Sequence, residues 1–129
     1  MFLSTKSFAD LKGKGLICAL SLGRPLAIYF WEDYRYVFNR IYRMNDEYYL
    51  KVSKIHNYYL DENFIHLGED ITGTNYMINR KTLEYVHELT EQSVGNCKVY
   101  DGTETSKRHR ELLKKLQQEY NKKLEGNKI

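Results

Sequence analysis

The chain has few of the residues that build covalent or rigid frameworks: one proline, one tryptophan and two cysteines in 129 residues. The cysteines, Cys18 and Cys97, are too few for a disulfide framework and lack the spacing of metal ligands. We therefore expect both thiols to be reduced, as is usual in the cytoplasm.

Long hydrophobic runs are also missing. The most apolar stretch, residues 15–31, is interrupted by Ser21, Gly23, Arg24 and Pro25. It falls short of the roughly 18 apolar residues that a membrane-spanning helix needs. The N-terminus has no basic region followed by an apolar stretch, so no secretory signal is predicted. These features predict a cytoplasmic protein that makes no membrane contact.

The net charge is only +3, and it is unevenly placed. Residues 1–100 carry 12 basic and 12 acidic side chains, whereas residues 101–129 carry 8 and 5. The whole excess therefore belongs to the C-terminal segment. Low net charge together with abundant aromatic residues argues against disorder, and the length predicts a single domain over residues 1–129.

What the chain does have is tyrosine. It contains 12, and ten of them lie between Tyr29 and Tyr85. The same region alternates apolar and polar residues with the period of two that is typical of strands. Strands are predicted over 16–22, 26–31, 34–44, 48–55 and 75–79, with a short edge segment at 98–100. Asn45-Asp46 predicts the turn of a hairpin.

Two segments outside these strands need separate treatment. The first dozen residues predict a short helix, with Ser4 as its N-cap and Phe8 and Leu11 on one face. Residues 83–89 fit either a returning strand or two turns of helix, and the surrounding strands favour the strand.

The C-terminal segment predicts an amphipathic helix over residues 103–124, capped by Thr103 or Thr105. Its apolar stripe is Leu112, Leu113, Leu116, Tyr120 and Leu124. The fold class is therefore α+β: an antiparallel, meander-like sheet of about five to seven strands in residues 1–100, a short N-terminal helix and the longer C-terminal helix.

Catalytic and metal-binding patterns are weak. Four acidic pairs lie at breaks between strands, where solvated turn residues are expected: Glu32-Asp33, Asp46-Glu47, Asp61-Glu62 and Glu69-Asp70. His66 has Glu69 and Asp70 nearby in sequence, but no motif of a hydrolytic metal site is complete. No glycine-rich phosphate loop, dinucleotide fingerprint or nucleophile elbow is present. We expect a protein that is not an enzyme and has no cofactor and no metal.

The tyrosines are the strongest functional feature. Neighbouring residues in a strand point to opposite faces, so one member of each pair, Tyr48-Tyr49 and Tyr58-Tyr59, should lie outside a one-sided core. Tyrosine and arginine are enriched at the centres of protein interfaces. The predicted partner-binding residues are Tyr36, Arg40, Tyr42, Arg43, Tyr49, Tyr58 and Tyr59.

The C-terminal helix has three interpretations. Its leucine stripe packs on the sheet, or it pairs with a second copy to form a homodimer, or its basic residues contact phosphates. The phosphate contacts would be Lys107, Arg108, Arg110, Lys114 and Lys115. Five interspersed acids weaken that third interpretation.

The stretch from Phe64 to Ile78, with His66-Leu67-Gly68-Glu69-Asp70 at its centre, resembles the strand–loop–strand of the SUKH superfamily. Those are α+β bacterial immunity proteins that bind toxins. The family's N-terminal helix with its proline and Gly-Gly turn has no counterpart here. The resemblance implies a small protein that works by binding another protein.

Two functional hypotheses follow. The first is an inhibitor or immunity-type protein of bacterial or phage origin, which binds another protein through the tyrosine-rich sheet face. The alternative is a small nucleic-acid-binding protein that uses the same face or the basic helix.

Overall fold

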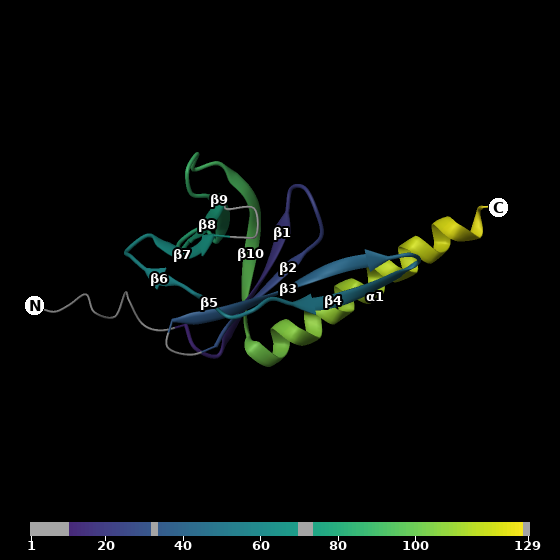
Figure 1. Ribbon diagram of the computed structural model, residues 1–129, viewed down its shortest axis with the longest axis horizontal. Helices are drawn as coiled ribbons and strands as arrows, with labels where there is room; N and C mark the ends of the chain where they lie inside the picture. The colour runs from purple at the N-terminus through teal and green to yellow at the C-terminus, as the bar shows by residue number, and fades with distance from the viewer. Residues whose placement is uncertain (1–10, 32–33, 70–73, 128–129) are drawn as a thin grey trace, which may run out of the picture.

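The computed structural model describes residues 11–31, 34–69 and 74–127. These form ten strands followed by one long helix (Figure 1). The strands are β1 (Lys14–Leu20), β2 (Leu26–Phe30), β3 (Arg35–Met44), β4 (Glu47–Val52), β5 (His56–Asn57), β6 (Tyr59–Leu60), β7 (Phe64–Glu69), β8 (Asn75–Asn79), β9 (Glu84–His87) and β10 (Ser93–Asp101). The helix is α1 (Gly102–Glu125).

All ten strands belong to one antiparallel sheet in the order β4-β3-β2-β1-β10-β9-β8-β7-β6, with β5 also paired to β3. The order consists of two meanders, β1 to β4 and β6 to β10, which are joined where β1 pairs with β10. The meander-like part of the prediction is therefore confirmed, but the first and last strands meet in the middle of the sheet.

The sheet curls until its two arms are bridged by a short stretch of chain. Only Tyr58 separates β5 from β6, and β5 pairs with β3 whereas β6 pairs with β7. Residues 56–60 therefore connect the two arms (Figure 1). The hydroxyl of Tyr36 on β3 donates a hydrogen bond to the carbonyl oxygen of Leu67 on β7 and ties the same two arms together.

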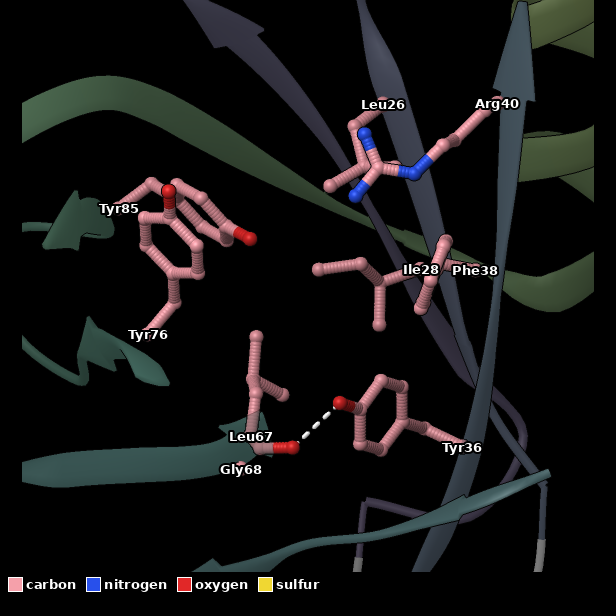
Figure 2. Close-up of a pocket in the computed structure, with 9 residues that line it drawn as sticks. All are labelled: Leu26, Ile28, Tyr36, Phe38, Arg40, Leu67, Gly68, Tyr76 and Tyr85. Carbon is pink, nitrogen blue, oxygen red and sulfur yellow. Dashed lines mark hydrogen bonds between the residues drawn. The ribbon is translucent and has the colours of Figure 1, made fainter. Parts of the chain in front are cut away.

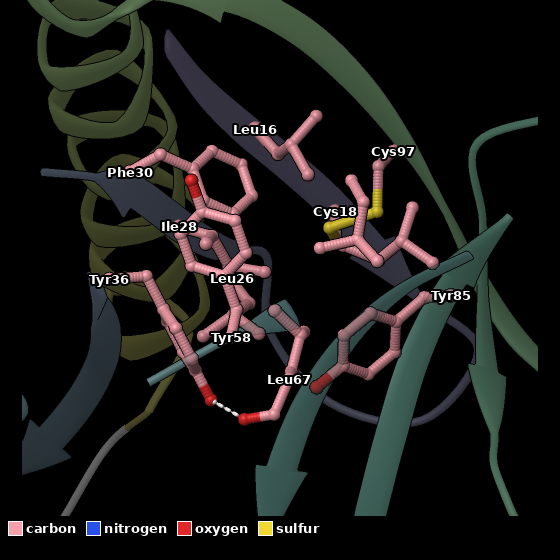
Figure 3. Close-up of a cluster of buried hydrophobic side chains, with 12 residues drawn as sticks. Leu16, Cys18, Leu26, Ile28, Phe30, Tyr36, Tyr58, Leu67, Tyr85 and Cys97 are labelled. Carbon is pink, nitrogen blue, oxygen red and sulfur yellow. Dashed lines mark hydrogen bonds between the residues drawn. A yellow bond between two sulfur atoms is a disulfide. The ribbon is translucent and has the colours of Figure 1, made fainter. Parts of the chain in front are cut away.

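The core lies inside this curl, where the inward residues of both arms meet (Figure 3). Its buried members are Leu16, Cys18, Leu26, Ile28, Phe30, Tyr36, Tyr58, Ile65, Leu67, Ile78, Tyr85 and Cys97. Each fully buried aliphatic side chain contributes about 1.5–3 kcal/mol to folding. The core therefore contains residues from both arms of the sheet: strands β1, β2, β3, β7, β8, β9 and β10 all contribute, together with Tyr58.

Helix α1 packs on the outer face of the sheet. A Cβ atom at Gly15 would lie 2.2 Å from Thr105 Oγ1, so the helix crosses β1 at a position where no side chain fits. His109 of the helix is fully buried, and its Nε2 donates to the carbonyl oxygen of Pro25 at 3.0 Å. These two contacts set where the helix lies on the sheet.

The expectation of about five to seven strands is wrong, because the sheet has ten. Strands β5 and β6 have two residues each, which is too short for an alternating pattern to be visible. The predicted edge segment at 98–100 is part of the nine-residue β10, which pairs on both sides. Residues 84–87 form a strand, as the surrounding strands favoured.

The C-terminal helix is confirmed, but its N-cap is Asp101 rather than Thr103 or Thr105. The Asp101 side chain accepts the N–H of Glu104 at 2.8 Å, whereas the Thr105 hydroxyl donates to the Asp101 carbonyl oxygen. Residues 1–10 of the predicted N-terminal helix lie outside the described residues, and residues 12 and 13, where that helix would end, form a turn rather than a helix.

The two cysteines form a disulfide, Cys18–Cys97, which corrects the expectation of reduced thiols. They are 79 residues apart in sequence but directly opposite each other in the β1–β10 register. The separation of the two cysteines in the sequence does not indicate that they pair. Bonds of this kind persist where the environment is oxidising.

The described residues contain no helix that is both long enough and apolar enough to cross a membrane.

Candidate functional site

The hairpin of β3 and β4 displays a row of aromatic and basic side chains on one face. Its turn lies at Asn45-Asp46 as predicted, with Asn45 at a φ of 56°. The register places Arg40 opposite Lys51 and Tyr42 opposite Tyr49. Together with Phe38, which points to the same side two residues before Arg40, these side chains form what we call the aromatic-basic face: Phe38, Arg40, Tyr42, Tyr49 and Lys51.

Cations and rings are in contact along this face. The Arg40 guanidinium carbon lies 4.7 Å from the centre of the Phe38 ring, and Lys51 Nζ lies 5.9 Å from the Tyr42 ring. Tyr42 in turn stacks on Tyr49, with centroids 5.8 Å apart and an interplanar angle of 26°. Such cation–ring contacts orient a positive charge without neutralising it.

The positive charge of the face is not matched by carboxylates. Across the described residues, neither Arg40 nor Lys51 has a carboxylate oxygen within 4.0 Å. Tyr49 is 37% exposed, and Met44 at the tip of the hairpin is 61% exposed. The face is therefore open to solvent at its outer end and attractive to negative groups.

The inner end of the face borders the mouth of the curled sheet. Figure 2 shows Arg40, Phe38 and Leu26 on one side of a small pocket and the stacked rings of Tyr76 and Tyr85 on the other. The space inside measures about 10 Å³, enough for a single water molecule at most. The core therefore leaves no room for a ligand in this pocket.

His56 extends the same aromatic array at the base of the hairpin. Its ring stacks on Phe38 at 5.2 Å and on Tyr36 at 5.3 Å. Burial lowers the pKa of His56, and the charge of Lys54 lowers it further. The ring is therefore neutral near pH 7, and the local positive field comes from the lysines and from Arg40.

Helix α1 supports the hairpin from its opposite face. Gln117 Oε1 accepts the Tyr48 N–H at 2.7 Å, and Gln117 Nε2 donates to the Asp46 carbonyl oxygen at 2.9 Å. The Tyr120 hydroxyl donates to Asp46 Oδ1 at 3.1 Å. The aromatic-basic face thus sits on a hairpin that is held to the helix rather than standing alone.

The predicted partner-binding residues do not form one group. Arg40, Tyr42 and Tyr49 come together on the aromatic-basic face. Arg43 points to the other side of the hairpin, where its guanidinium lies 4.7 Å from the Tyr120 ring. Phe38 and Lys51 complete the face and were not among the predicted residues. The expected turn at Asn45-Asp46 already implied that Lys51 lies opposite Arg40.

Tyr36 and Tyr58 require a correction, because they are only 3% and 4% exposed and belong to the core. Both sit at the bridge between the two arms of the sheet, where an inward side chain has core on every side. Tyr59, the neighbour of Tyr58, is 61% exposed, as the argument from alternating faces requires. It lies away from the hairpin, on β6.

The ring of Tyr59 lies over His66, whose ring nitrogens form hydrogen bonds to two carboxylates. Its ring stacks on His66 at 4.3 Å with an interplanar angle of 4°. His66 Nε2 donates to Asp61 Oδ2 at 2.7 Å, and Nδ1 donates to Glu88 Oε2 at 3.1 Å. The acidic residues near His66 in sequence were Glu69 and Asp70, but the Glu69 side chain and all of Asp70 lie outside the described part of the structure.

This arrangement shifts two pKa values. Burial lowers the pKa of His66, but its hydrogen bonds to Asp61 and Glu88 and their charges raise it more, so the pKa lies above its ordinary value. The hydrogen bond from His66 is the main reason that the pKa of Asp61 is lowered. Over residues 11–31, 34–69 and 74–127, no group of three or more histidine, cysteine, aspartate or glutamate side chains is placed so that it could hold a metal ion. The cluster connects the β6–β7 turn to the chain after β9.

The apolar stripe of the helix lies against the sheet and is half-buried along its length: Leu112, Leu113, Leu116, Tyr120 and Leu124. The most buried helical residues, Thr105 and His109, precede that stripe on the same side and were not expected. Of the basic residues proposed for phosphate contact, Lys107, Arg110 and Lys114 are exposed away from the sheet, whereas Arg108 and Lys115 line a groove beside it.

Comparison with known proteins identifies no relative: no family model, no curated protein and no solved structure matches this chain. The resemblance of residues 64–78 to the SUKH superfamily therefore receives no support from these comparisons.

Proposed function

We propose that this protein is a non-enzymatic binding protein that acts on another protein through the aromatic-basic face. The observation that carries the proposal is the set of two cations held on ring faces, Arg40 on Phe38 and Lys51 on Tyr42. Among the described residues, no carboxylate oxygen lies within 4.0 Å of either cation. Tyrosine and arginine on a supported surface are the residues that contribute most at protein interfaces.

The partner surface that fits this face carries acidic groups next to apolar ones. Arg40 and Lys51 lie opposite each other across the strands and attract carboxylates, while Tyr49 and Met44 supply exposed apolar area. Charge complementarity of this kind speeds association and selects the partner. An inhibitor or immunity-type role, in which the protein blocks its partner by occupying it, fits a rigid surface of this kind.

Site-specific cross-linking tests the proposal. A photoreactive phenylalanine placed at Tyr49 should capture a partner in bacterial cells, and the same residue placed at Gln118 on the exposed side of α1 should not. With the captured partner purified, Lys51→Glu should weaken binding about tenfold or more, as measured by calorimetry. Equal capture from both positions, or unchanged affinity of the Lys51 variant, would show that the face is not the interface.

Single-stranded nucleic acid is the alternative partner. It is favoured by the stack of Tyr42 on Tyr49 with Lys51 above, because bases stack on aromatic rings while lysines contact phosphates. Fluorescence anisotropy with a labelled single-stranded oligonucleotide tests it. Binding should weaken steeply between about 50 and 200 mM salt. If no binding is detected at the lower salt concentration, this alternative is excluded.

A further inference from the structure

A groove of about 490 Å³ runs between α1 and the outer face of β1 and β10. Its apolar lining comes from both sides: Ile17 and Ala19 on β1, and Leu112 on the helix. It lies on the opposite face of the sheet from the aromatic-basic face, since Cys18 points into the core and its neighbours on β1 point outward. The groove is therefore separate from the proposed partner site.

The packing of the helix explains why the groove exists. Helix and strand touch where Thr105 lies over Gly15. Further along β1, the outward residue is again small, Ala19, and it is exposed rather than covered. His109 fixes Pro25, another lining residue, through its 3.0 Å hydrogen bond. Small residues on the strand and a fixed loop thus leave an open space beside the helix.

Charged groups border this space with a positive excess. Lys98 projects from β10, and Arg108 and Lys115 from α1, against one acid among the lining residues, Glu111. Arg108 shares its charge with Glu104, since Arg108 Nε lies 2.9 Å from Glu104 Oε2. In the part of the chain that the structure describes, Lys98 and Lys115 have no carboxylate oxygen within 4.0 Å.

We propose that this groove binds a small amphiphilic carboxylate. The apolar body of the ligand lies on Ile17, Ala19 and Leu112, and its carboxylate lies between Lys98 and Lys115. The volume falls within the range of about 300–1,000 Å³ that is usual for small-molecule sites, and an apolar lining with a few polar groups is their usual composition. A neutral or cationic head would leave the two lysines without a partner.

Titration with dodecanoate, kept below its critical micelle concentration, tests the site. In two-dimensional NMR spectra of the labelled protein, saturable shifts should be confined to the groove, at Ile17, Ala19, Lys98 and Leu112. Dodecyltrimethylammonium has the same chain and the opposite charge, and it should bind at least about tenfold more weakly. If dodecanoate does not bind, or if its shifts are scattered over the surface, the proposal is wrong.

Variants separate the groove from general electrostatic attraction. Lys98→Glu/Lys115→Glu should weaken dodecanoate binding about tenfold or more. Lys107→Glu/Lys114→Glu makes the same change in net charge on the exposed side of the same helix and should leave the affinity within about twofold. An equal loss in both pairs would overturn the proposal.

A second variant tests the apolar lining. Ala19→Trp should fill the groove and abolish binding, and because Ala19 is exposed, the variant should fold, which circular dichroism checks. Undiminished binding by the folded variant would contradict the assigned position. If the variant does not fold, the comparison of the two lysine pairs decides the question. Neither result depends on whether the aromatic-basic face binds a protein.

Discussion

Thr105 of the helix lies so close to Gly15 of β1 that a Cβ atom at Gly15 would come within 2.2 Å of the Thr105 hydroxyl oxygen and 2.7 Å of its Cβ. Distances below 3.0 Å require atoms to move. Gly15, on a central strand, therefore determines how closely the helix approaches the sheet. Because the helix also holds the β3–β4 hairpin, the position of that hairpin depends on the same contact.

Gly15→Ala should therefore destabilise the protein. The added methyl group pushes Thr105 and the first turns of α1 away from β1, at a cost of about 1–3 kcal/mol that is typical of overpacking. Urea unfolding measures the loss. Gly126→Ala is the matched control, because its Cβ would meet only Lys123 O, at an ordinary 3.6 Å. Equal stability of the Gly15 variant and the wild type would mean that the helix is not packed as described.

Gln117→Ala should loosen the tip of the β3–β4 hairpin. The side chain satisfies the Tyr48 N–H and the Asp46 carbonyl oxygen, and its loss leaves both to solvent. We expect a loss of about 1 kcal/mol and faster hydrogen exchange at the Tyr48 amide, measured by NMR. Gln118→Ala, one residue along on the exposed side of the helix, should change neither. Unchanged exchange at Tyr48 would show that the helix does not hold the hairpin.

Stability should depend on pH through the His66 cluster. Because the pKa of folded His66 is raised, its contribution is complete below the unfolded pKa of about 6.5 and is lost as pH rises through the folded pKa. The lowered pKa of Asp61 has the opposite sign: its contribution is present above the unfolded pKa and is lost as pH falls through the folded value.

Unfolding at about pH 5.5 and 8.5 measures the histidine contribution, and it should be larger at the lower pH. The effect should be at most about 1 kcal/mol, because Asp61 and Glu88 are partly exposed. His66→Gln should remove most of this pH dependence. His87→Gln is the control, since Nδ1 of His87 accepts the Thr90 N–H and, within the described part of the chain, no carboxylate oxygen lies within 4.0 Å of its ring nitrogens. Identical pH profiles for the wild type and the His66 variant would contradict the assignment.

Reduction of Cys18–Cys97 should destabilise the protein substantially. The bond closes a loop with a sequence separation of 79, for which the loss of unfolded-state entropy stabilises folding by up to about 4.5 kcal/mol. Urea unfolding with and without a phosphine reductant measures the difference, and Cys18→Ala/Cys97→Ala controls for other effects of the reductant. Peptide mapping without reductant should recover the linked pair. Recovery of two free thiols from protein prepared under oxidising conditions would show that the bond does not form.

The β3–β4 hairpin and the helix could be predicted because their information is local. Alternation over 34–44 and 48–55, with a turn at Asn45-Asp46, is sufficient for the register that puts Arg40 beside Lys51. Leucines recurring every four residues, with Glu104 in the first turn and Lys122 and Lys123 in the last, are sufficient for the helix.

The remaining features depend on residues that are distant in sequence. Cys18 meets Cys97 only because β10 returns to the middle of the sheet beside β1. His66 meets Glu88 only because of how β7, β8 and β9 follow one another. The sequence around Tyr36 and Tyr58 predicts exposed side chains, yet the curled sheet buries both. An alternating pattern shows that a strand has two faces, but which face becomes interior is decided when the arms close around a shared core.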